Sequence, residues 1–252
     1  MSIEFRKLRH DMRPSLMVGP PRDSAAEIRA DLDYAELRRT RNSHQGLAQH
    51  QHLRELAVAG CNQAVMEEIG ELTQLEKLEL RWPMRGTESL EPLKNLKDLT
   101  YLKIDSPGAK VTDFTPILDL PKLEVLMITN AKHLFDIEWM KPMKNRLRIL
   151  GLEGAIDTDQ RIASLEPLRE FAIETFLCIS MTLKSRDITP LETCPNLKFI
   201  DGAVIAPWAQ YHALEQARPI IVCGWFDPKN WMPSGAAARP RNCSANQPQP
   251  IR

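Results

Sequence analysis

Residues 75–98, LEKLELRWPMRGTESLEPLKNLKD, carry the pattern that determines the fold. This stretch opens with L-x-x-L-x-L, and two stretches of the same length follow it, 99–122 (LTYLKIDSPGAKVTDFTPILDLPK) and 123–146 (LEVLMITNAKHLFDIEWMKPMKNR). Similarity at a fixed interval of roughly 20–50 residues is typical of solenoids, in which each repeat stacks on the next. The sequence therefore predicts a repeat protein.

The same opening pattern, with Ile or Val sometimes in place of Leu, recurs through the middle of the chain. Its starts are Leu53, Leu75, Leu99, Leu123, Leu147 and Leu197. Including one degenerate copy before the last start, the pattern predicts about seven repeats over residues 53–203.

The degenerate copy can be placed in two ways. If it begins at Glu174, then Leu177 and Ile179 are its inward-facing residues. If LREFAI forms the strand instead, Phe171 and Ile173 turn inward. The first placement is the one we adopt for the surface described below.

The second half of each repeat is patterned as well. Apolar residues lie nine, six and three positions before the next start, a spacing that favours a short helix or 3₁₀ turn. Proline recurs seven residues before a start, where it fits the first helical turn because its missing N–H costs nothing there. These prolines are Pro92, Pro116, Pro167 and Pro190, while Pro142 lies five residues before its start.

Together these features resemble the leucine-rich repeat family. The segments VTDFTPILDLPKL (111–123) and RDITPLETCPNL (186–197) are most similar to the short-repeat subclass found in internalins and in a phosphatase regulatory subunit. The resemblance covers residues 53–203. It implies an α/β solenoid, a right-handed horseshoe or arc with a parallel β-sheet on its concave face and 3₁₀ or short helices on its convex face. It also implies protein binding, for which the family is widely used.

One feature departs from the family pattern. Leucine-rich repeats usually carry Asn or Cys eight residues after the first Leu, where the side chain satisfies backbone groups of the turn. Here that place is taken by Cys61, Pro83, Pro107, Ala131, Ala155, Thr182 and Ile205. We expect irregular turns, with Pro83 and Pro107 supplying stiffness that hydrogen bonds would otherwise give.

Composition restricts the function classes. The chain has 33 basic and 33 acidic residues, so it lacks the excess positive charge of a nucleic-acid-binding protein. No apolar segment follows the basic start as in a secretory signal, and no membrane span is expected. The five cysteines are odd in number and lack C-x-x-C spacing, which favours thiols in a reducing compartment. We expect a cytoplasmic protein without cofactor, and a monomer by default.

The flanks of the repeats differ in character. Residues 1–52 are expected to form an N-terminal cap, with a helix over 24–39 that covers the apolar end of the first repeat. Residues 204–232 are expected to form a C-terminal cap that begins with a helix over 207–217. Residues 233–252 are rich in Pro, Ser, Asn and Gln, and we expect them to be disordered.

The concave face is the candidate partner-binding site. Strand alternation places the third, fifth and seventh residues of each L-x-x-L-x-L repeat on it. The predicted binding residues are Lys77, Glu79, Arg81, Tyr101, Lys103, Asp105, Val125, Met127, Thr129, Ile149, Glu153 and Phe176. Gly151, Cys178 and Ser180 share the face. The face therefore changes from charged to apolar along the solenoid.

The apolar part of this face has two explanations. Val125, Met127, Ile149 and Phe176, with Phe199 as a possible fifth member, form a larger bare patch than a monomer normally exposes. Either it docks a partner protein, with Met and aromatic side chains as anchors, or the C-terminal segment with Trp225, Phe226 and Trp231 folds back over it. We favour the partner.

Other candidate sites are weaker. His44, His50 and His52 cluster, but no further metal ligand accompanies them at a recognised spacing, so we interpret them as loop residues. Cys178 lacks a neighbouring base, and we interpret it as a packed residue rather than a nucleophile.

The main functional prediction is a protein-interaction module that acts as an adaptor, regulator or inhibitor. A bacterial-type immunity protein or antitoxin is the alternative. An enzyme is the least supported class, because ubiquitin-ligase effectors with such repeats carry a separate catalytic domain and only the twenty residues 233–252 follow the predicted cap here.

Overall fold

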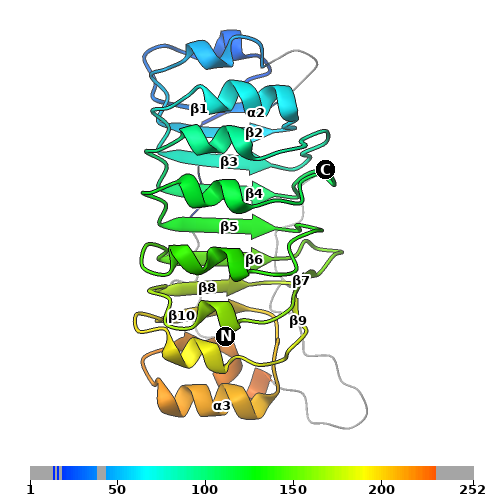
Figure 1. The fold of residues 1–252 in the computed structure, drawn as a ribbon, viewed down its shortest axis with the longest axis vertical. Coiled ribbons are helices and arrows are strands. Elements are labelled where there is room, and N and C mark those ends of the chain that lie inside the picture. The colour runs from blue at the N-terminus through cyan, green and yellow to red at the C-terminus, as the bar shows by residue number, and fades with distance from the viewer. Residues whose placement is uncertain (1–13, 15, 17–18, 39–43, 231–252) are drawn as a thin grey trace.

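One parallel sheet organises the molecule. The structure is a computed structural model that describes residues 14, 16, 19–38 and 44–230. Nine strands form the sheet in the order β1-β2-β3-β4-β5-β6-β8-β10-β11, and β7 pairs with β9 outside it (Figure 1). The strands of the sheet are β1 Tyr34–Arg38, β2 Glu55–Ala59, β3 Lys77–Arg81, β4 Tyr101–Asp105, β5 Val125–Thr129, β6 Ile149–Glu153, β8 Thr175–Cys178, β10 Phe199–Gly202 and β11 Val222–Cys223. The outer pair is β7 Gln160–Ile162 and β9 Met181–Leu183.

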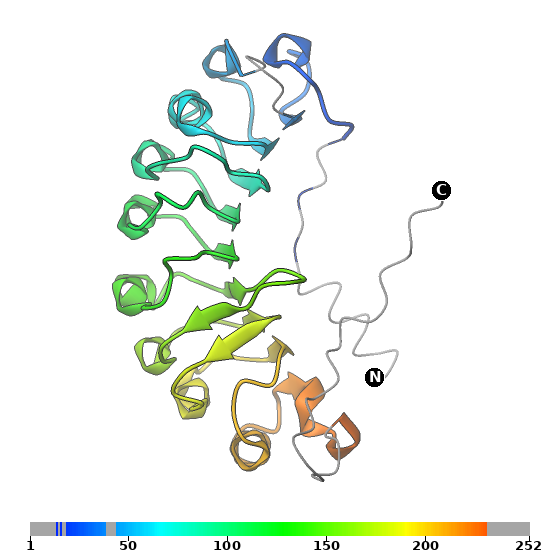
Figure 2. The same ribbon diagram turned by 90° about the vertical axis from the view of Figure 1, so that its right-hand side faces the viewer.

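Short helices lie opposite the sheet, on the outer side of the repeats (Figure 2). Figure 2 shows the sheet on the inner side of an arc and the helices on its outer side. The α-helices are α2 Gln63–Gly70 and α3 Trp208–Ala217. The 3₁₀ helices are η1 Ala25–Glu27, η2 Leu47–Gln49, η3 Glu91–Asn95, η4 Thr115–Asp119, η5 Glu138–Met143, η6 Glu166–Leu168, η7 Thr189–Thr193, η8 Gly224–Phe226 and η9 Pro228–Asn230. The fold is a leucine-rich repeat solenoid, as the sequence predicts.

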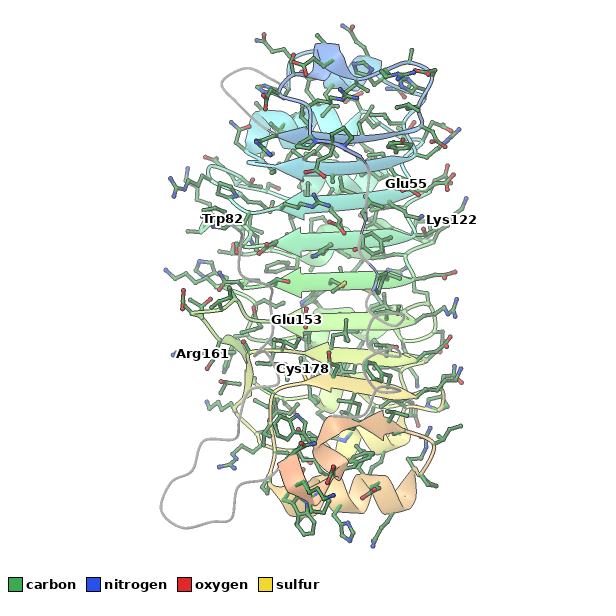
Figure 3. The ribbon with its side chains drawn as sticks, turned by 180° about the vertical axis from the view of Figure 1, so that it is seen from behind. Glu55, Trp82, Lys122, Glu153, Arg161 and Cys178 are labelled. Atoms are coloured by element: carbon green, nitrogen blue, oxygen red, sulfur yellow. The ribbon has the colours of Figure 1, made fainter. Side chains whose placement is uncertain are left out.

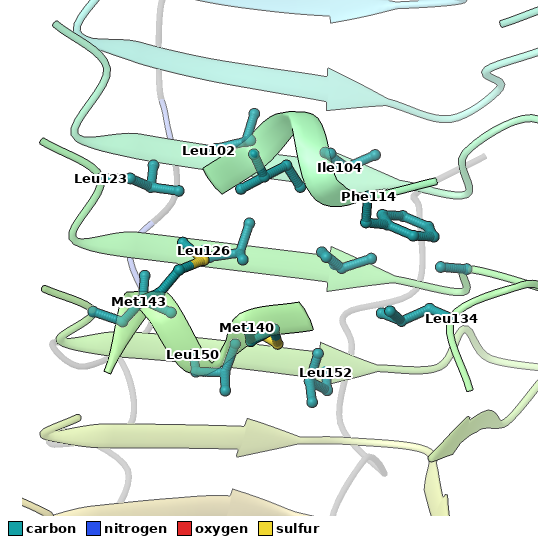
Figure 4. Close-up of a cluster of buried hydrophobic side chains, with 14 of the residues drawn as sticks. Leu102, Ile104, Phe114, Leu123, Leu126, Leu134, Met140, Met143, Leu150 and Leu152 are labelled. Atoms are coloured by element: carbon teal, nitrogen blue, oxygen red, sulfur yellow. The ribbon is translucent and has the colours of Figure 1, made fainter. Parts of the chain in front are cut away.

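The core lies between the sheet and the outer helices. The fourth and sixth residues of each repeat point into it, so that Leu102, Leu126 and Leu150 lie side by side on adjacent strands. Met140 and Met143 of η5 close the same layer from the convex side (Figure 4). Removing one such side chain costs about 2–5 kcal/mol, because the stacked repeats cannot collapse into the space.

Proline opens most of the outer turns. Pro92, Pro116, Pro167 and Pro190 lie in the first turn of η3, η4, η6 and η7, which confirms the predicted role of the seven-residue spacing. Pro142 lies inside η5 instead.

The predicted helix over 24–39 is wrong. Only Ala25–Glu27 is helical, and residues 34–38 form β1, which pairs with β2 along its whole length. Ala35 and Leu37 point into the core as the fourth and sixth residues of an L-x-x-A-x-L pattern that begins at Leu32. Pairing with the edge of an existing sheet satisfies more backbone groups than a short isolated helix could.

The ends of the solenoid are covered in different ways. Arg22 lies along the edge of β1, where its N–H donates to Glu36 O at 2.7 Å and its carbonyl accepts from Arg38 N at 2.8 Å. At the other end α3 matches the helix predicted over 207–217. The prediction of disorder for 233–252 concerns residues outside the described ranges. No helix in the described part of the chain has the length and apolar character needed to cross a membrane.

Candidate partner-binding face

The concave face consists of three columns of side chains that run across the strands. The middle column holds the fifth residue of each repeat and contains, in spatial order, Glu36, Ala57, Glu79, Lys103, Met127, Gly151, Leu177 and Asp201. Figure 3 views the molecule from this side, with Glu55 at the start of its strand and Trp82 beyond the end of the next. No helix of the described residues covers the face, since all of them lie at the ends or on the convex side.

Phe176 is not on this face, and the predicted register of the degenerate repeat is wrong. Phe176 pairs with the inward-facing Leu150 and is fully buried in the core, and Cys178 points inward with it. The repeat therefore starts at Ile173, and Thr175, Leu177 and Ile179 occupy the concave positions.

The reason is an insertion in the preceding repeat. Residues 154–163 leave the sheet after β6 and form β7, which pairs with β9 (Figure 1). This lengthens the repeat to 26 residues, from Leu147 to Ile173, so neither a start at Glu174 nor a strand over LREFAI (168–173) gives the observed strand.

A charged network occupies the face at β1, β3 and β4. Arg81 lies at its centre: its Nη1 is 2.8 Å from Glu36 Oε2, and its Nε is 2.9 Å from Glu79 Oε2. The hydroxyl of Tyr101 donates to Glu79 Oε1 at 2.7 Å. Three strands, β1, β3 and β4, thus contribute to one network.

This network binds the main chain of a distant segment. Leu16 N donates to Glu79 Oε1 at 2.7 Å, and Arg81 Nη2 donates to Leu16 O at 2.8 Å. Pro14 O lies 3.3 Å from the Tyr101 hydroxyl. The side chain of Leu16 packs on Ala57. Charged side chains of the face therefore satisfy both polar backbone groups of one residue.

The pKa values in the network follow from these contacts. Burial raises the pKa of Glu79, but the hydrogen bonds from Leu16 and Tyr101 and the nearby charge of Lys103 outweigh it and hold the pKa below its usual value. Burial lowers the pKa of Arg81, yet its bonds to Glu79 and Glu36 raise it overall. Burial and the charge of Glu79 raise the pKa of Tyr101. Glu79 and Arg81 thus form a charged pair and Tyr101 a neutral donor.

The remaining charged candidates are less involved. Lys77 forms an ion pair with Glu55 at 2.6 Å, and both side chains are partly exposed. Lys103 is half-buried beside Glu79. Asp105 accepts from the hydroxyl of Ser106 at 2.9 Å. These side chains form the rim of the network.

An apolar patch lies on the face next to the network. It comprises Val125, Met127, Ile149, Leu177 and Phe199. Met127, Leu177 and Phe199 are at most 2% exposed, and Val125 and Ile149 are half-buried against them. Thr129 and Glu153 lie in the seventh-residue column beside the patch, where Glu153 accepts from Ile179 N at 3.4 Å.

Trp225 and Phe226 of the C-terminal segment do not pack on the patch. Trp225 and Phe226 belong to the main core, and Trp225 Nε1 donates to Gly202 O at 2.7 Å at the end of the solenoid. Trp231 lies outside the described residues. Among described residues, the explanation in which this segment folds back over the patch has no support.

The weaker candidates show no catalytic or metal-binding arrangement. Cys178 is buried, and desolvation raises the pKa of its thiol well above the usual value, which disfavours the reactive thiolate. His50 and His52 contact each other edge to face, with ring centroids 5.6 Å apart. Within the described ranges, no three His, Cys, Asp or Glu side chains form a group that could hold a metal ion.

Sequence reasoning missed part of the face. Leu177 follows directly from the corrected register, Ala57 is the fifth residue of the repeat that starts at Leu53, and Glu36 follows once β1 is recognised. Leu16 and Pro14 carry no repeat pattern that could have placed them there.

Two solved structures are similar to this chain in fold. One is internalin C2 from Listeria monocytogenes, with 19% sequence identity, a TM-score of 0.43 and coverage of 62% of this chain and 63% of that chain. The other is the leucine-rich repeat ectodomain of the Arabidopsis receptor kinase HAESA, solved with a peptide hormone, with 16% identity, a TM-score of 0.44 and coverage of 69% and 30%. The chain thus spans less than two thirds of either. Neither the models of known protein families nor the curated proteins give a match.

Proposed function

We propose that this protein is a non-enzymatic interaction module that binds a protein partner on its concave face. The observation that carries the proposal is the binding of Leu16 by Glu79 and Arg81, because it supports the ability of this face to hold a polypeptide main chain. Val125 and Ile149 of the adjacent apolar patch are half-buried and supply the kind of apolar contact that anchors protein interfaces.

The binding face in this proposal combines the charged network and the apolar patch. Relative to the sequence prediction, Phe176 is removed and Leu177 and Phe199 are added. The network would set the register of the partner, and the half-buried Val125 and Ile149 of the patch would supply apolar contacts. A cytoplasmic location is part of the proposal, because the odd cysteine count without C-x-x-C spacing favours a reducing compartment.

The test is an affinity purification from native lysate with the tagged full chain. The concave variants are Lys103→Glu with Met127→Glu, and Lys103→Glu with Val125→Glu. Val125 is only half-buried, so the second variant is less disruptive than the first. The matched control is Lys141→Glu with Ile220→Glu, which changes a convex lysine and an exposed apolar residue.

We expect the wild type and the control to retain the same partner and both concave variants to lose it. Circular dichroism must first show that every variant is folded. Folded concave variants that retain every partner of the wild type would refute the proposal.

A further inference from the structure

The main-chain N–H and C=O of Leu16 are hydrogen-bonded as they would be by a neighbouring β-strand, but their partners are side chains. In a sheet, the N–H and C=O of one residue bond to the main chain of the next strand. Here a carboxylate accepts from Leu16 N and a guanidinium donates to Leu16 O, both within 2.8 Å. Charge-assisted bonds of this kind are roughly twice as strong as neutral ones. Contacts to main-chain atoms do not depend on which side chain the bound residue carries.

Selectivity comes from the side chain that the site accommodates. Ala57, with its small side chain, lies between Glu36 and Glu79 in the middle column, and the leucine packs on it. Leu16 is 5% exposed as a result. A larger residue in place of Ala57 would fill the space, whereas a charged residue in place of Leu16 would lie against apolar surface beside two carboxylates.

The bound segment crosses the strands instead of extending one. Pro14 lies over Tyr101 of β4, Leu16 lies over Ala57 and Glu79 of β2 and β3, and Arg22 lies beside β1. The described residues Pro14, Leu16 and Arg22 thus lie in this order from the middle of the face toward its first edge. A peptide from another molecule that crosses the same strands would meet the same groups.

We propose that Ala57, Glu79, Arg81 and Tyr101 form a binding site for an extended peptide with a leucine-sized side chain, and that Pro14 and Leu16 of this chain occupy it. The inference rests on the proposed function, because it makes the chain's own segment a competitor for part of the partner-binding face. A peptide of the same chemistry displaces this segment and takes over its contacts.

Because it is covalently attached, the chain's own segment has an advantage over a free peptide, but its binding to the site remains reversible. A segment this short buries far less than the roughly 1,200 Å² of a stable interface, so its intrinsic affinity is low. Its effective concentration is on the order of 1 mM, the value typical of a site and an occupant joined by a short stretch of chain. If the free peptide binds with a Kd of about 100 µM, the attached segment weakens its binding about ten-fold.

The experiment measures binding of a fluorescein-labelled peptide of residues 9–20, RHDMRPSLMVGP, to the full chain by anisotropy. Leu16→Asp in the full chain empties the site while the rest of the face stays unchanged. We expect the Leu16→Asp variant to bind the peptide and the wild type to bind it about ten-fold more weakly. A peptide that itself carries Leu16→Asp should not bind.

Further variants locate the site. Adding Ala57→Phe or Arg81→Ala to Leu16→Asp should abolish peptide binding, since the first fills the space for leucine and the second removes the donor to the carbonyl. Adding Lys141→Glu on the convex side should leave binding unchanged. Circular dichroism identifies any variant that does not fold, and two independent site variants protect the test against that outcome.

Each result is decisive. Failure of Leu16→Asp to bind the peptide, or equal binding by Leu16→Asp and wild type, overturns the occupied-site inference. Binding that survives both Ala57→Phe and Arg81→Ala overturns the assignment of the site. The proposed function is judged separately by partner loss in Lys103→Glu with Val125→Glu. If that variant loses the partner while the peptide fails to bind, the interaction face stands and the occupied site falls.

Discussion

Gln160 of β7 satisfies the turn of a preceding repeat: its Oε1 accepts from Ala131 N at 2.8 Å, and its Nε2 donates to Leu134 O at 2.6 Å. Ala131 stands where leucine-rich repeats usually carry an Asn or Cys that makes such bonds. The insertion that contains β7 therefore supplies the side-chain hydrogen bonds that Ala131 cannot make for its own turn. Gln160 is 2% exposed, so no water can replace it easily.

Gln160→Leu should destabilise the protein by about 2–6 kcal/mol, because two buried backbone groups lose their partners at about 1–3 kcal/mol each. Urea unfolding followed by circular dichroism measures the change. The neighbouring Arg161 is exposed, and Arg161→Leu should stay within about 0.5 kcal/mol of wild type. Equal effects of the two substitutions would contradict this role of Gln160.

Other turns are held by individual side chains as well. Thr87 Oγ1 donates to Cys61 O at 3.3 Å, and Gln63 Oε1 accepts from the N–H groups of Glu88 and Ser89 at 3.0 Å each. After several strands the chain reverses through a residue with positive φ, and Asn130 at 52° is one of them. The missing Asn ladder is thus replaced turn by turn, which a single repeat pattern could not predict.

Phe176→Ala tests the corrected register. Because Phe176 is fully buried in the core, its removal should cost about 3–5 kcal/mol in urea unfolding. Ile156 is 90% exposed, so Ile156→Ala should have little effect. If Phe176 lay on the concave face as the sequence prediction had it, Phe176→Ala would instead be tolerated.

The sequence predicts those parts of the fold whose residues recur at the 24-residue repeat interval. Leu102, Leu126 and Leu150 recur every 24 residues, and the observed strands place them side by side. Phe176 was misplaced because a local insertion shifted the period before it. The helix over 24–39 was predicted from spacing that fits a helix, although the L-x-x-A-x-L pattern at Leu32 also fits a strand. Tertiary pairing decided between the two.

The site that binds the main chain of Leu16 could not be predicted from the sequence, for a different reason. Leu16 contacts Glu79 across 63 positions of sequence, and the contact involves backbone atoms that every residue has. Only the column of side chains on the face could be predicted, and Glu79, Arg81 and Tyr101 belong to it.

The cysteines should react slowly in the folded protein. Cys61, Cys178, Cys194 and Cys223 are all buried, and burial raises the pKa of Cys194 to about 11. Cys243 lies outside the described residues, so the test uses Cys243→Ser. We expect labelling with a chromogenic disulfide reagent at pH 8 to be at least about 1000-fold slower in buffer than in denaturant, because reaction then requires unfolding. Rapid labelling of any one of the four thiols would show that its site opens.

Glu79 should make stability depend on pH in acid. The charged and titratable groups that face it are Glu36 of β1, Glu55 of β2, Lys77 and Arg81 of β3, and Tyr101 and Lys103 of β4. Burial opposes the charged form of Glu79, but the bonds from Leu16 and Tyr101 and the charge of Lys103 lower its pKa overall. A carboxylate with a lowered pKa stabilises the fold above its unfolded pKa of about 4.3 and loses that contribution as the pH falls through the folded value.

Glu79→Gln removes the charge while it keeps the shape of the side chain. At pH 7 we expect it to lower the free energy of unfolding by roughly 1.5–3 kcal/mol, the range for bonds to a charged group. Urea titrations between pH 8 and pH 3 should show this difference unchanged down to about pH 5 and shrinking below about pH 4.3, where the wild-type carboxylate is protonated in the unfolded chain. Glu55→Gln, which breaks a partly exposed ion pair, should cost less than about 1 kcal/mol. A difference between wild type and Glu79→Gln that stayed constant to pH 3 would mean that the charge of Glu79 does not stabilise this face.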